Sequence, residues 1–335
     1  MRALVPGLTL ALLLSGCNEL QSALHPRGPQ GALLADLFWF FTAVCGAVWI
    51  AVMVVLALAL LRQRPPDLRP PLELDLARER HSAITVAVAV AATAVTLIVF
   101  VVTSYLATRN MAQAARGDAV EIKLTGRQWW WDLEYQDAQP DRTVRSANEI
   151  HIPVGRPIKI TLAAADVIHS FWVPNLTGKQ DLIPGRENVI AFAAARPGFY
   201  RGQCAEFCGL QHTHMGLFAV AEAPEAFEAW RDAQRKPAVE PQNAEQRLGR
   251  DAFMRKGCSA CHAISGTNAM GRLGPDLTHV GSRRTLAAAT LPNSRGSLAA
   301  WIADPQGIKP GNRMPRVPLT PDELNGVAAY LESLK

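Results

Sequence analysis

The chain has 335 residues, a formal net charge of +5, and a hydrophobic fraction of 49%. This length allows two or three compact units, and a mean hydropathy of +0.06 is high for a protein without membrane segments. The positive charges are not gathered into a basic run interleaved with aromatic residues, so the sequence argues against a nucleic-acid-binding protein. Membrane segments are therefore the first feature to look for.

Residues 1–16 have the layout of an export signal. Arg2 precedes a short apolar core that ends at small residues. The segment Leu14-Ser15-Gly16-Cys17 resembles a bacterial lipobox, in which Cys17 becomes the lipidated first residue of the mature chain. The alternative is a plain signal peptide followed by an incidental cysteine. Both interpretations predict a mature N-terminus outside the cytoplasm.

Two long apolar stretches follow, at about 33–61 and 84–106. Each exceeds the roughly 20 residues that a helix needs to cross the hydrocarbon layer. The connector 62–80 carries five arginines, whereas Arg27 is the only Lys or Arg between Cys17 and the first stretch. By the positive-inside rule the connector is cytoplasmic and both chain ends lie outside. Residues 17–110 thus predict a membrane anchor of two transmembrane helices.

Residues 111–222 show the alternation of half-buried strands. Apolar residues alternate with polar ones over 120–124 and 158–162, and further short strands are expected at 188–192, 198–203 and 217–221. Pro and Gly turns separate them, which predicts an all-β sandwich. Residues 223–243 are rich in Ala, Pro, Glu and Gln, and we expect a linker there apart from a short helix near 227–234.

Residues 244–335 are predicted to be helical. Thr320 can cap a final helix that has Pro321 at its first position and Glu323 as the partner in a capping box. Within this part, Cys258-Ser-Ala-Cys261-His262 has the spacing at which two thiols bond to one haem and the next histidine ligates its iron.

A low-spin haem needs a sixth ligand, and a thioether raises its potential. Met314, just before the final helix, has the reach to be that ligand, with Met270 and His279 as alternatives. Residues 273–277 (Leu-Gly-Pro-Asp-Leu) resemble the loop that packs on the proximal histidine in class I cytochromes c. The alternative for that loop is an ordinary Gly-Pro turn.

A second cysteine pair, Cys204 and Cys208, is followed by His212 and Met215 between two predicted strands. A structural zinc ion prefers four strong nitrogen or sulfur ligands and has no use for a thioether. Thiolate, imidazole and a weak methionine ligand suit electron-transferring copper. His169 could add a second imidazole, so that two coppers share both sulfurs. A disulfide with bystander histidines is the alternative.

These residues, together with the segment 126–135 (Gly-Arg-Gln-Trp-Trp-Trp-Asp-Leu-Glu-Tyr) and the two-span anchor, resemble subunit II of haem–copper cytochrome c oxidases. With its appended cytochrome, the chain resembles the bacterial caa3-type form over essentially its whole mature length. The resemblance implies a transmembrane helix hairpin, a cupredoxin-like Greek-key sandwich and an all-α class I cytochrome c domain.

The resemblance also implies a binuclear copper A centre. Two cysteines would bridge the coppers, one histidine would bind each copper, and a methionine and a backbone carbonyl would complete the shells. The Glu206 carboxylate would also help to bind a magnesium ion shared with subunit I. The implied copper ligands are Cys204, Cys208, His169, His212, Met215 and the carbonyl of Glu206.

The resemblance also bears on several residues outside the main ligand set. Trp129 matches the exposed tryptophan through which the family receives electrons, whereas Trp130 and Trp131 are expected to pack in the sandwich. His214 is an alternative ligand to His212. In the family, an acidic residue before the second span is commonly followed by a tryptophan and a proline, but neither follows Glu79 here. We therefore expect the Glu79 carboxylate to be solvated rather than to lie at the mouth of a proton channel in subunit I.

The implied function is that of the subunit through which electrons enter a terminal oxidase in the bacterial inner membrane. An external cytochrome c would reduce the haem c, and copper A would pass electrons to subunit I, which reduces oxygen to water with proton translocation. Subunit III and membrane lipid are further expected partners, and both metal-binding domains would be periplasmic or extracellular. The alternatives are the small subunit of a copper A-containing nitric oxide reductase and a free-standing, membrane-tethered electron carrier.

Charge suggests how the two domains could meet. Residues 118–222 contain 10 basic and 12 acidic residues, net −2, whereas residues 245–335 contain 12 basic and 7 acidic residues, net +5. Opposite charges favour encounter, and a linker raises the effective concentration, so weak docking would suffice. The alternative is that both are ordinary solvated surfaces.

Overall fold

The computed structural model describes residues 19–62, 75–113 and 117–335, which fall into two compact units. One unit comprises residues 33–111, and the other comprises the remaining described residues. The expected signal segment 1–16, the lipobox cysteine Cys17 and most of the arginine-containing connector lie outside the described residues.

The smaller unit consists of two long helices, α2 (Pro29–Leu61) and α3 (Leu76–Gln113), the first turn of α2 lying in the other unit. Both are long and apolar enough to cross a membrane, judged by length and composition. The rings of Phe41 and Phe100 pack with centroids 4.4 Å apart and join the helices. The helix α3 extends beyond the apolar stretch 84–106 at both ends, because the polar residues that flank it continue the helix.

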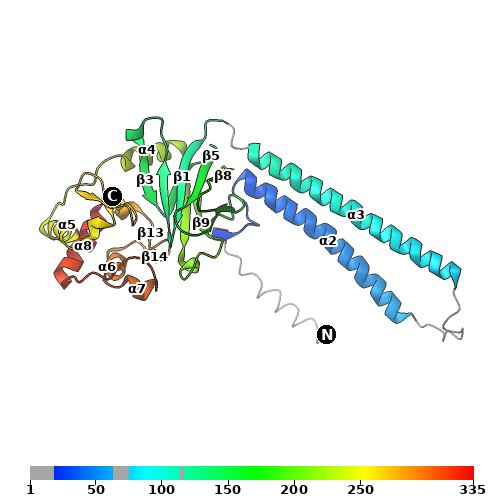
Figure 1. The fold of residues 1–335 in the computed structure, drawn as a ribbon. Coiled ribbons are helices and arrows are strands. Elements are labelled where there is room, and N and C mark those ends of the chain that lie inside the picture. The colour runs from blue at the N-terminus through cyan, green and yellow to red at the C-terminus, as the bar shows by residue number, and fades with distance from the viewer. Residues whose placement is uncertain (1–18, 63–74, 114–116) are drawn as a thin grey trace, which may run out of the picture. The chain divides into compact units, whose positions relative to one another are not determined.

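The β-rich part of the larger unit is a sandwich of two five-stranded sheets (Figure 1). In the first sheet the order is β3-β2-β1-β5-β8, with β1 antiparallel to β2 and parallel to β5. In the second sheet the order is β4-β10-β9-β6-β7. The strands are β1 (Val120–Arg127), β2 (Trp130–Tyr135), β3 (Val144–Ala147), β4 (Glu149–Pro153), β5 (Ile158–Ala164), β6 (His169–Trp172), β7 (Gln180–Leu182), β8 (Asn188–Phe192), β9 (Gly198–Cys204) and β10 (Gly216–Glu222).

The alternation expected from the sequence is confirmed in these strands. Every second residue of β1 is buried, among them Ile122 and Leu124. Trp131 is fully buried and meets Phe171 edge to face, which confirms its expected packing role. Burial of this alternating apolar face between the two sheets is the main favourable term for the sandwich.

Part of the expected linker packs on the sandwich. The helix α4 (Pro224–Gln234) buries Phe227 completely, and its Trp230 ring stacks on His151 at 4.2 Å. Because this aromatic anchoring belongs to the sandwich core, the segment that joins the sandwich to the helical part is shorter than the composition suggested and begins after residue 234.

The C-terminal part contains the helices α5 (Ala244–Arg255), α6 (Arg295–Ala303), α7 (Pro305–Ile308) and α8 (Pro321–Ser333). Residues of α5, α6 and α8 contribute to an apolar core of its own. Phe253 of α5 meets Tyr330 of α8, and a Cβ on Gly249 would overlap the backbone of Gly326, so the two helices approach closely only because glycine is present. The Thr320 capping box is confirmed. The remaining short elements are η1 (Glu19–Gln21), η2 (Pro140–Arg142), η3 (His212–His214), η4 (Cys258–Ala260), η5 (Val280–Ser282), β11 (Ala263–Ile264), β12 (Ala269–Met270), β13 (Thr285–Leu286) and β14 (Leu291–Pro292).

Candidate metal centre and haem-attachment segment

Strand pairing brings the sulfur-rich loop and a distant histidine together. Cys204 is the last residue of β9, and β10 begins at Gly216, so residues 205–215 form the loop between two antiparallel neighbours. The strand β6, which begins at His169, pairs with β9 through Phe171 opposite Cys204. A residue 35 positions earlier in the sequence thus reaches the mouth of the loop.

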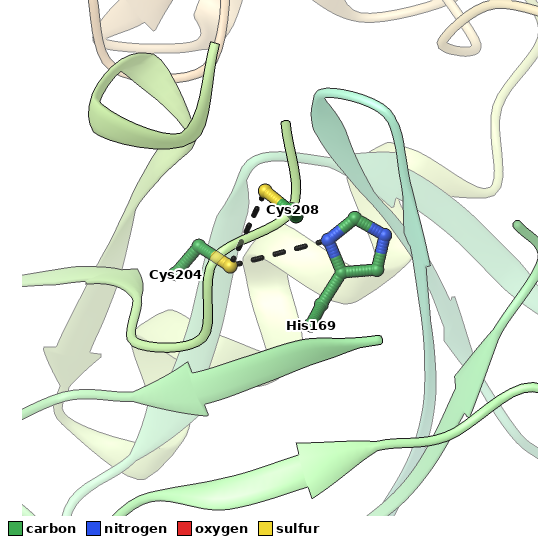
Figure 2. A group of neighbouring side chains, drawn as sticks. All are labelled: His169, Cys204 and Cys208. Carbon is green, nitrogen blue, oxygen red and sulfur yellow. Dashed lines mark hydrogen bonds between the residues drawn. The ribbon is translucent and has the colours of Figure 1, made fainter. Parts of the chain in front are cut away.

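His169, Cys204 and Cys208 form a compact buried group (Figure 2). The two Sγ atoms are 3.7 Å apart, and His169 Nδ1 lies 3.9 Å from Cys204 Sγ. A disulfide has sulfur atoms about 2.05 Å apart. Both cysteines are free, so the geometry does not support the disulfide alternative.

Three further donors from the loop surround the same sulfurs. His212 Nδ1 lies 3.6 Å from Cys208 Sγ, and Met215 Sδ lies 3.8 Å from it. The Glu206 carbonyl oxygen lies 3.2 Å from Cys204 Sγ. Bonds of about 2.3 Å to sulfur and 2.0 Å to nitrogen place neighbouring tetrahedral ligand atoms about 3.5–3.8 Å apart. The spacing of these atoms therefore fits shared metal ions.

A carboxylate behind His169 fixes the orientation of its ring. His169 Nε2 donates to Asp166 Oδ1 at 2.8 Å, which leaves Nδ1 to face Cys204. Although burial raises the pKa of Asp166, hydrogen bonds from His169 and from backbone N–H groups lower it to about 2. Gly126 provides room, since a Cβ there would lie 2.7 Å from the His169 ring. Sequence reasoning missed Asp166, whose one signal was its position three residues before His169.

The electrostatics of the two thiols favour a bound cation. The Cys208 side chain lowers the pKa of Cys204 to about 4, and the resulting thiolate raises the pKa of Cys208. Two adjacent thiolates repel each other, and a metal ion removes this conflict because a coordinating thiol is deprotonated. Two thiolates, two imidazoles and a buried thioether form a soft donor set that fits copper.

The side chains of His214 and Glu206 are near the sulfur group in the sequence but do not belong to it. His214 is exposed, and its Nδ1 pairs with Gln211 Oε1 at 2.8 Å. The Glu206 carboxylate is about half exposed and lies 3.9 Å from Lys179 Nζ. In the part of the chain that the structure describes, no second carboxylate joins Glu206 in a metal-binding group.

Trp129 is not exposed, contrary to the expectation. Its exposed fraction is 8%, and its Nε1 donates to the Cys208 carbonyl at 2.9 Å. The side chain belongs to the apolar core of the sandwich and lies close to Gly209, while Lys309 of the C-terminal part donates to the Trp129 carbonyl at 3.1 Å. Trp129 therefore lies beside the sulfur loop where the two domains meet, rather than on an open surface.

The haem-attachment residues lie in and just after the η4 turn. Cys258 and Cys261 are free and partly buried. His262 Nδ1 donates to the Pro275 carbonyl at 2.8 Å, which leaves Nε2 with a free lone pair. Burial lowers the pKa of His262 and keeps the imidazole neutral, the form that binds iron. The 273–277 loop thus packs on His262 as expected, and the residues fit a covalently bound haem.

The structure separates the candidates for the sixth ligand by their surroundings. Met314 is partly buried, and its backbone is held by Asn312 Oδ1 and Gln306 Nε2. Met270 is 77% exposed. His279 is buried and its Nε2 donates to the Lys236 carbonyl at 3.0 Å, so that nitrogen is already used.

Comparison with known proteins places these features in one family. The cytochrome c oxidase subunit II periplasmic domain matches residues 139–222, and the cytochrome c domain matches residues 246–335. Cytochrome c oxidase subunit 2 of Alkalihalophilus pseudofirmus is 33% identical over 337 residues, which cover 97% of this chain and 95% of that protein. The Bacillus subtilis subunit 2 is 31% identical over 65% of this chain and 63% of that protein.

Among solved structures, the periplasmic domain of cytochrome oxidase subunit II from Bradyrhizobium japonicum is 31% identical. The match covers 36% of this chain and 96% of that domain, with a TM-score of 0.34. Because the Alkalihalophilus relative matches nearly the full length of both chains, this chain belongs to the cytochrome c oxidase subunit 2 family, in a form that carries a cytochrome c domain.

Proposed function

We propose that this chain is the subunit through which electrons enter a terminal cytochrome c oxidase. It takes electrons from an external cytochrome c and delivers them to subunit I, where oxygen is reduced to water with proton translocation. The observation that carries the proposal is the convergence of His169, Cys204, Cys208, His212 and Met215 in a chain that also has a haem-attachment segment.

The proposed copper A ligands are the side chains that converge on the two sulfurs, with the Glu206 carbonyl as a further donor. A bound copper pair supplies one-electron chemistry with little change in geometry. The chain prepares this site because β6 and β9 fix the distance from His169 to Cys204, and Asp166 holds the His169 ring. Such supporting carboxylates orient a metal-binding histidine and make it a stronger donor.

Cys258 and Cys261 would hold a haem c through thioether bonds, and His262 and Met314 would be the ligands of its iron. A bound haem c supplies a one-electron couple whose potential a thioether ligand raises. The chain contributes the Pro275 carbonyl, which orients His262, and Gln306, which anchors the backbone of the Met314 loop. Trp129, whose ring donates to the Cys208 carbonyl, would be the residue through which electrons enter the copper site.

The chain acts as a membrane-anchored part of a larger assembly. We propose that α2 and α3 both span the bacterial inner membrane and place both termini on the periplasmic or extracellular side, with subunits I and III as partners. Glu206 would contribute to a magnesium site shared with subunit I. Family membership supports the oxidase over a free-standing carrier, since the matching relatives are oxidase subunits.

Replacing Cys208 by serine in the assembled oxidase tests the proposal. Loss of one shared sulfur should remove copper and abolish the near-infrared band of the binuclear centre, while the haem c spectrum stays unchanged. Cys45→Ser is the matched control, because Cys45 is a free, exposed cysteine in α2. A Cys208→Ser variant that keeps both copper and the band would refute the copper assignment.

A further inference from the structure

The loop that leads to Met314 lies along the copper-domain surface. Gln211 Nε2 donates to the Pro310 carbonyl at 2.7 Å, and Leu210 packs so closely on Gly311 that a Cβ there would lie 2.7 Å from its methyl carbon. Arg313 Nη2 donates to Gln128 Oε1 at 3.0 Å. Residues 309–313, which we term the docking segment, thus contact the sulfur loop from outside.

Lys309 is the centre of this contact. Its side chain is buried, with an exposed fraction of 3% for the residue. Its Nζ donates to the carbonyls of Trp129 at 3.1 Å, His214 at 2.8 Å and Ala287 at 3.1 Å. An ammonium group has three donors, so all three are used. Two acceptors belong to the copper domain and one belongs to the haem domain.

The two copper-domain acceptors lie directly beside proposed copper ligands. His214 precedes Met215 in the chain, and the Trp129 ring donates to the carbonyl of Cys208. Burial lowers the pKa of Lys309 to about 8. At neutral pH the Lys309 ammonium group is therefore charged in most molecules. Its hydrogen bonds are then charge-assisted, and such bonds are stronger than those between neutral groups.

A second set of contacts lies nearby and fixes the relative orientation of the domains. The backbone N–H of Gly216 donates to the Ala288 carbonyl at 3.1 Å, and the N–H of Arg284 donates to Glu149 Oε2 at 3.0 Å. The Arg284 guanidinium lies 3.7 Å above the centre of the Phe199 ring. Contacts at two separate sites prevent rotation about either one.

We propose that the docking segment holds the haem domain in one fixed position on the copper loop, and that Lys309 is the positioning residue of this dock. The inference rests on the proposed function. The docking segment ends one residue before Met314, so the loop with the proposed iron ligand also contacts the backbone beside two proposed copper ligands, Cys208 and Met215. Electron transfer then occurs from a bound arrangement, not from random encounters on a linker.

Electron transfer within a fixed dock and electron transfer by random encounters on a linker should respond differently to salt. An encounter between a domain of net charge +5 and one of net charge −2 weakens as salt screens exposed charges. A buried ammonium held by carbonyls is screened much less. Transfer within a fixed dock should therefore be nearly independent of ionic strength.

The experiment compares Lys309→Met with Lys335→Met in the full chain in lipid nanodiscs. Both variants remove one lysine charge, but Lys335 is an exposed terminal residue. In Lys309→Met we expect hydrogen exchange to speed up about tenfold or more at the Gly216 and Arg284 amides, because each donates across the dock. Exchange in α8 should stay unchanged, and Lys335→Met should match the parent chain.

A second readout uses the chain loaded with haem and copper. After photoreduction of the haem, internal electron transfer in Lys309→Met should slow about tenfold or more, since the docked population falls by that factor. The rate should also become salt-dependent, while reduction of the haem by an external donor stays unchanged. Unchanged exchange at Gly216 and Arg284 in Lys309→Met would overturn the dock.

Two results would require a further comparison: faster exchange in α8 of the Lys309→Met variant, and a parent chain that binds no copper or haem. If Lys309→Met also speeds exchange in α8, the double variant Gln211→Ala/Arg313→Ala decides, because it removes other side chains of the dock and leaves the buried lysine in place. It must speed exchange at the same two amides, and no change there overturns the dock. If the parent chain binds no copper or haem, the proposed function fails, whereas the exchange data still report on the dock.

Discussion

Replacing Gly274 by alanine tests how the chain holds its proposed proximal histidine. A Cβ on Gly274 would lie 2.6 Å from Cε1 and 2.9 Å from Nδ1 of His262. Non-bonded carbon atoms rest about 3.5–4.0 Å apart. The ring or the loop must therefore move by about 1 Å, and overpacking of this kind costs about 1–3 kcal/mol. The φ angle of Gly274 is not in the left-handed region, so the collision with His262 is the cause of the effect.

The displacement should appear in the haem potential. It disturbs the 2.8 Å hydrogen bond from His262 Nδ1 to the Pro275 carbonyl, which strengthens Nε2 as a donor to iron. A weaker donor stabilises oxidised iron less, so the potential should rise. A loss of about 1 kcal/mol corresponds to about 40 mV for a one-electron couple. Redox titration of the haem in the full chain measures this shift directly.

Gly296→Ala is the matched control for this experiment. No atom lies within 4 Å of a Cβ at Gly296, which is in the first turn of α6. It adds the same methyl group to the same domain without a collision, so the haem potential should stay at the parent value. A Gly274→Ala variant with both the parent potential and the parent melting temperature would contradict the collision with His262.

Two other predictions concern the iron and a buried charge cluster. Met314→Ala should lower the haem potential, because it removes the thioether; an unchanged potential would point to Met270. His151 pairs with Glu149 at 3.0 Å and with Glu222 at 2.9 Å. Burial lowers the pKa of His151, but the two carboxylates raise it, and the net result in the folded protein lies above the ordinary value of 6.5. The protonated histidine therefore stabilises the fold below pH 6.5, and this stabilisation is lost as the pH rises through the pKa of the folded state. Thermal unfolding should show a decline of at most about 1.4 kcal/mol per pH unit there, and a decline that persists in His151→Gln would exclude this histidine as its source.

Local signals predicted much of this molecule because they are set by near neighbours in the sequence. Alternation placed the strands, and the Thr320 box marked the start of α8. The loop from Cys204 to Met215 has its ligand types at spacings that one turn can bring together. What the sequence does not contain is the pairing of β6 with β9, which brings His169 to the sulfurs across 35 positions.

Two features that the sequence did not reveal have the same physical origin. The family resemblance implied an exposed Trp129, but its ring is buried and donates to the Cys208 carbonyl, 79 positions later in the chain. A short helix was expected within the linker segment 223–243, but composition did not reveal that its Phe227 and Trp230 pack on Tyr135 and His151. In both cases a contact between distant segments decided burial, and composition carries no information about such a contact.

Net charge indicated an attraction between the domains but not the way in which they dock. The net charges describe a long-range effect, whereas the acceptors of Lys309 are backbone carbonyls, and every residue has one. Carbonyls become a binding site only when the fold aligns them, and the path of the sulfur loop sets the positions of those at Trp129 and His214. Since the proposed copper ligands belong to that loop, the residues that would hold copper also shape the surface on which the C-terminal domain rests.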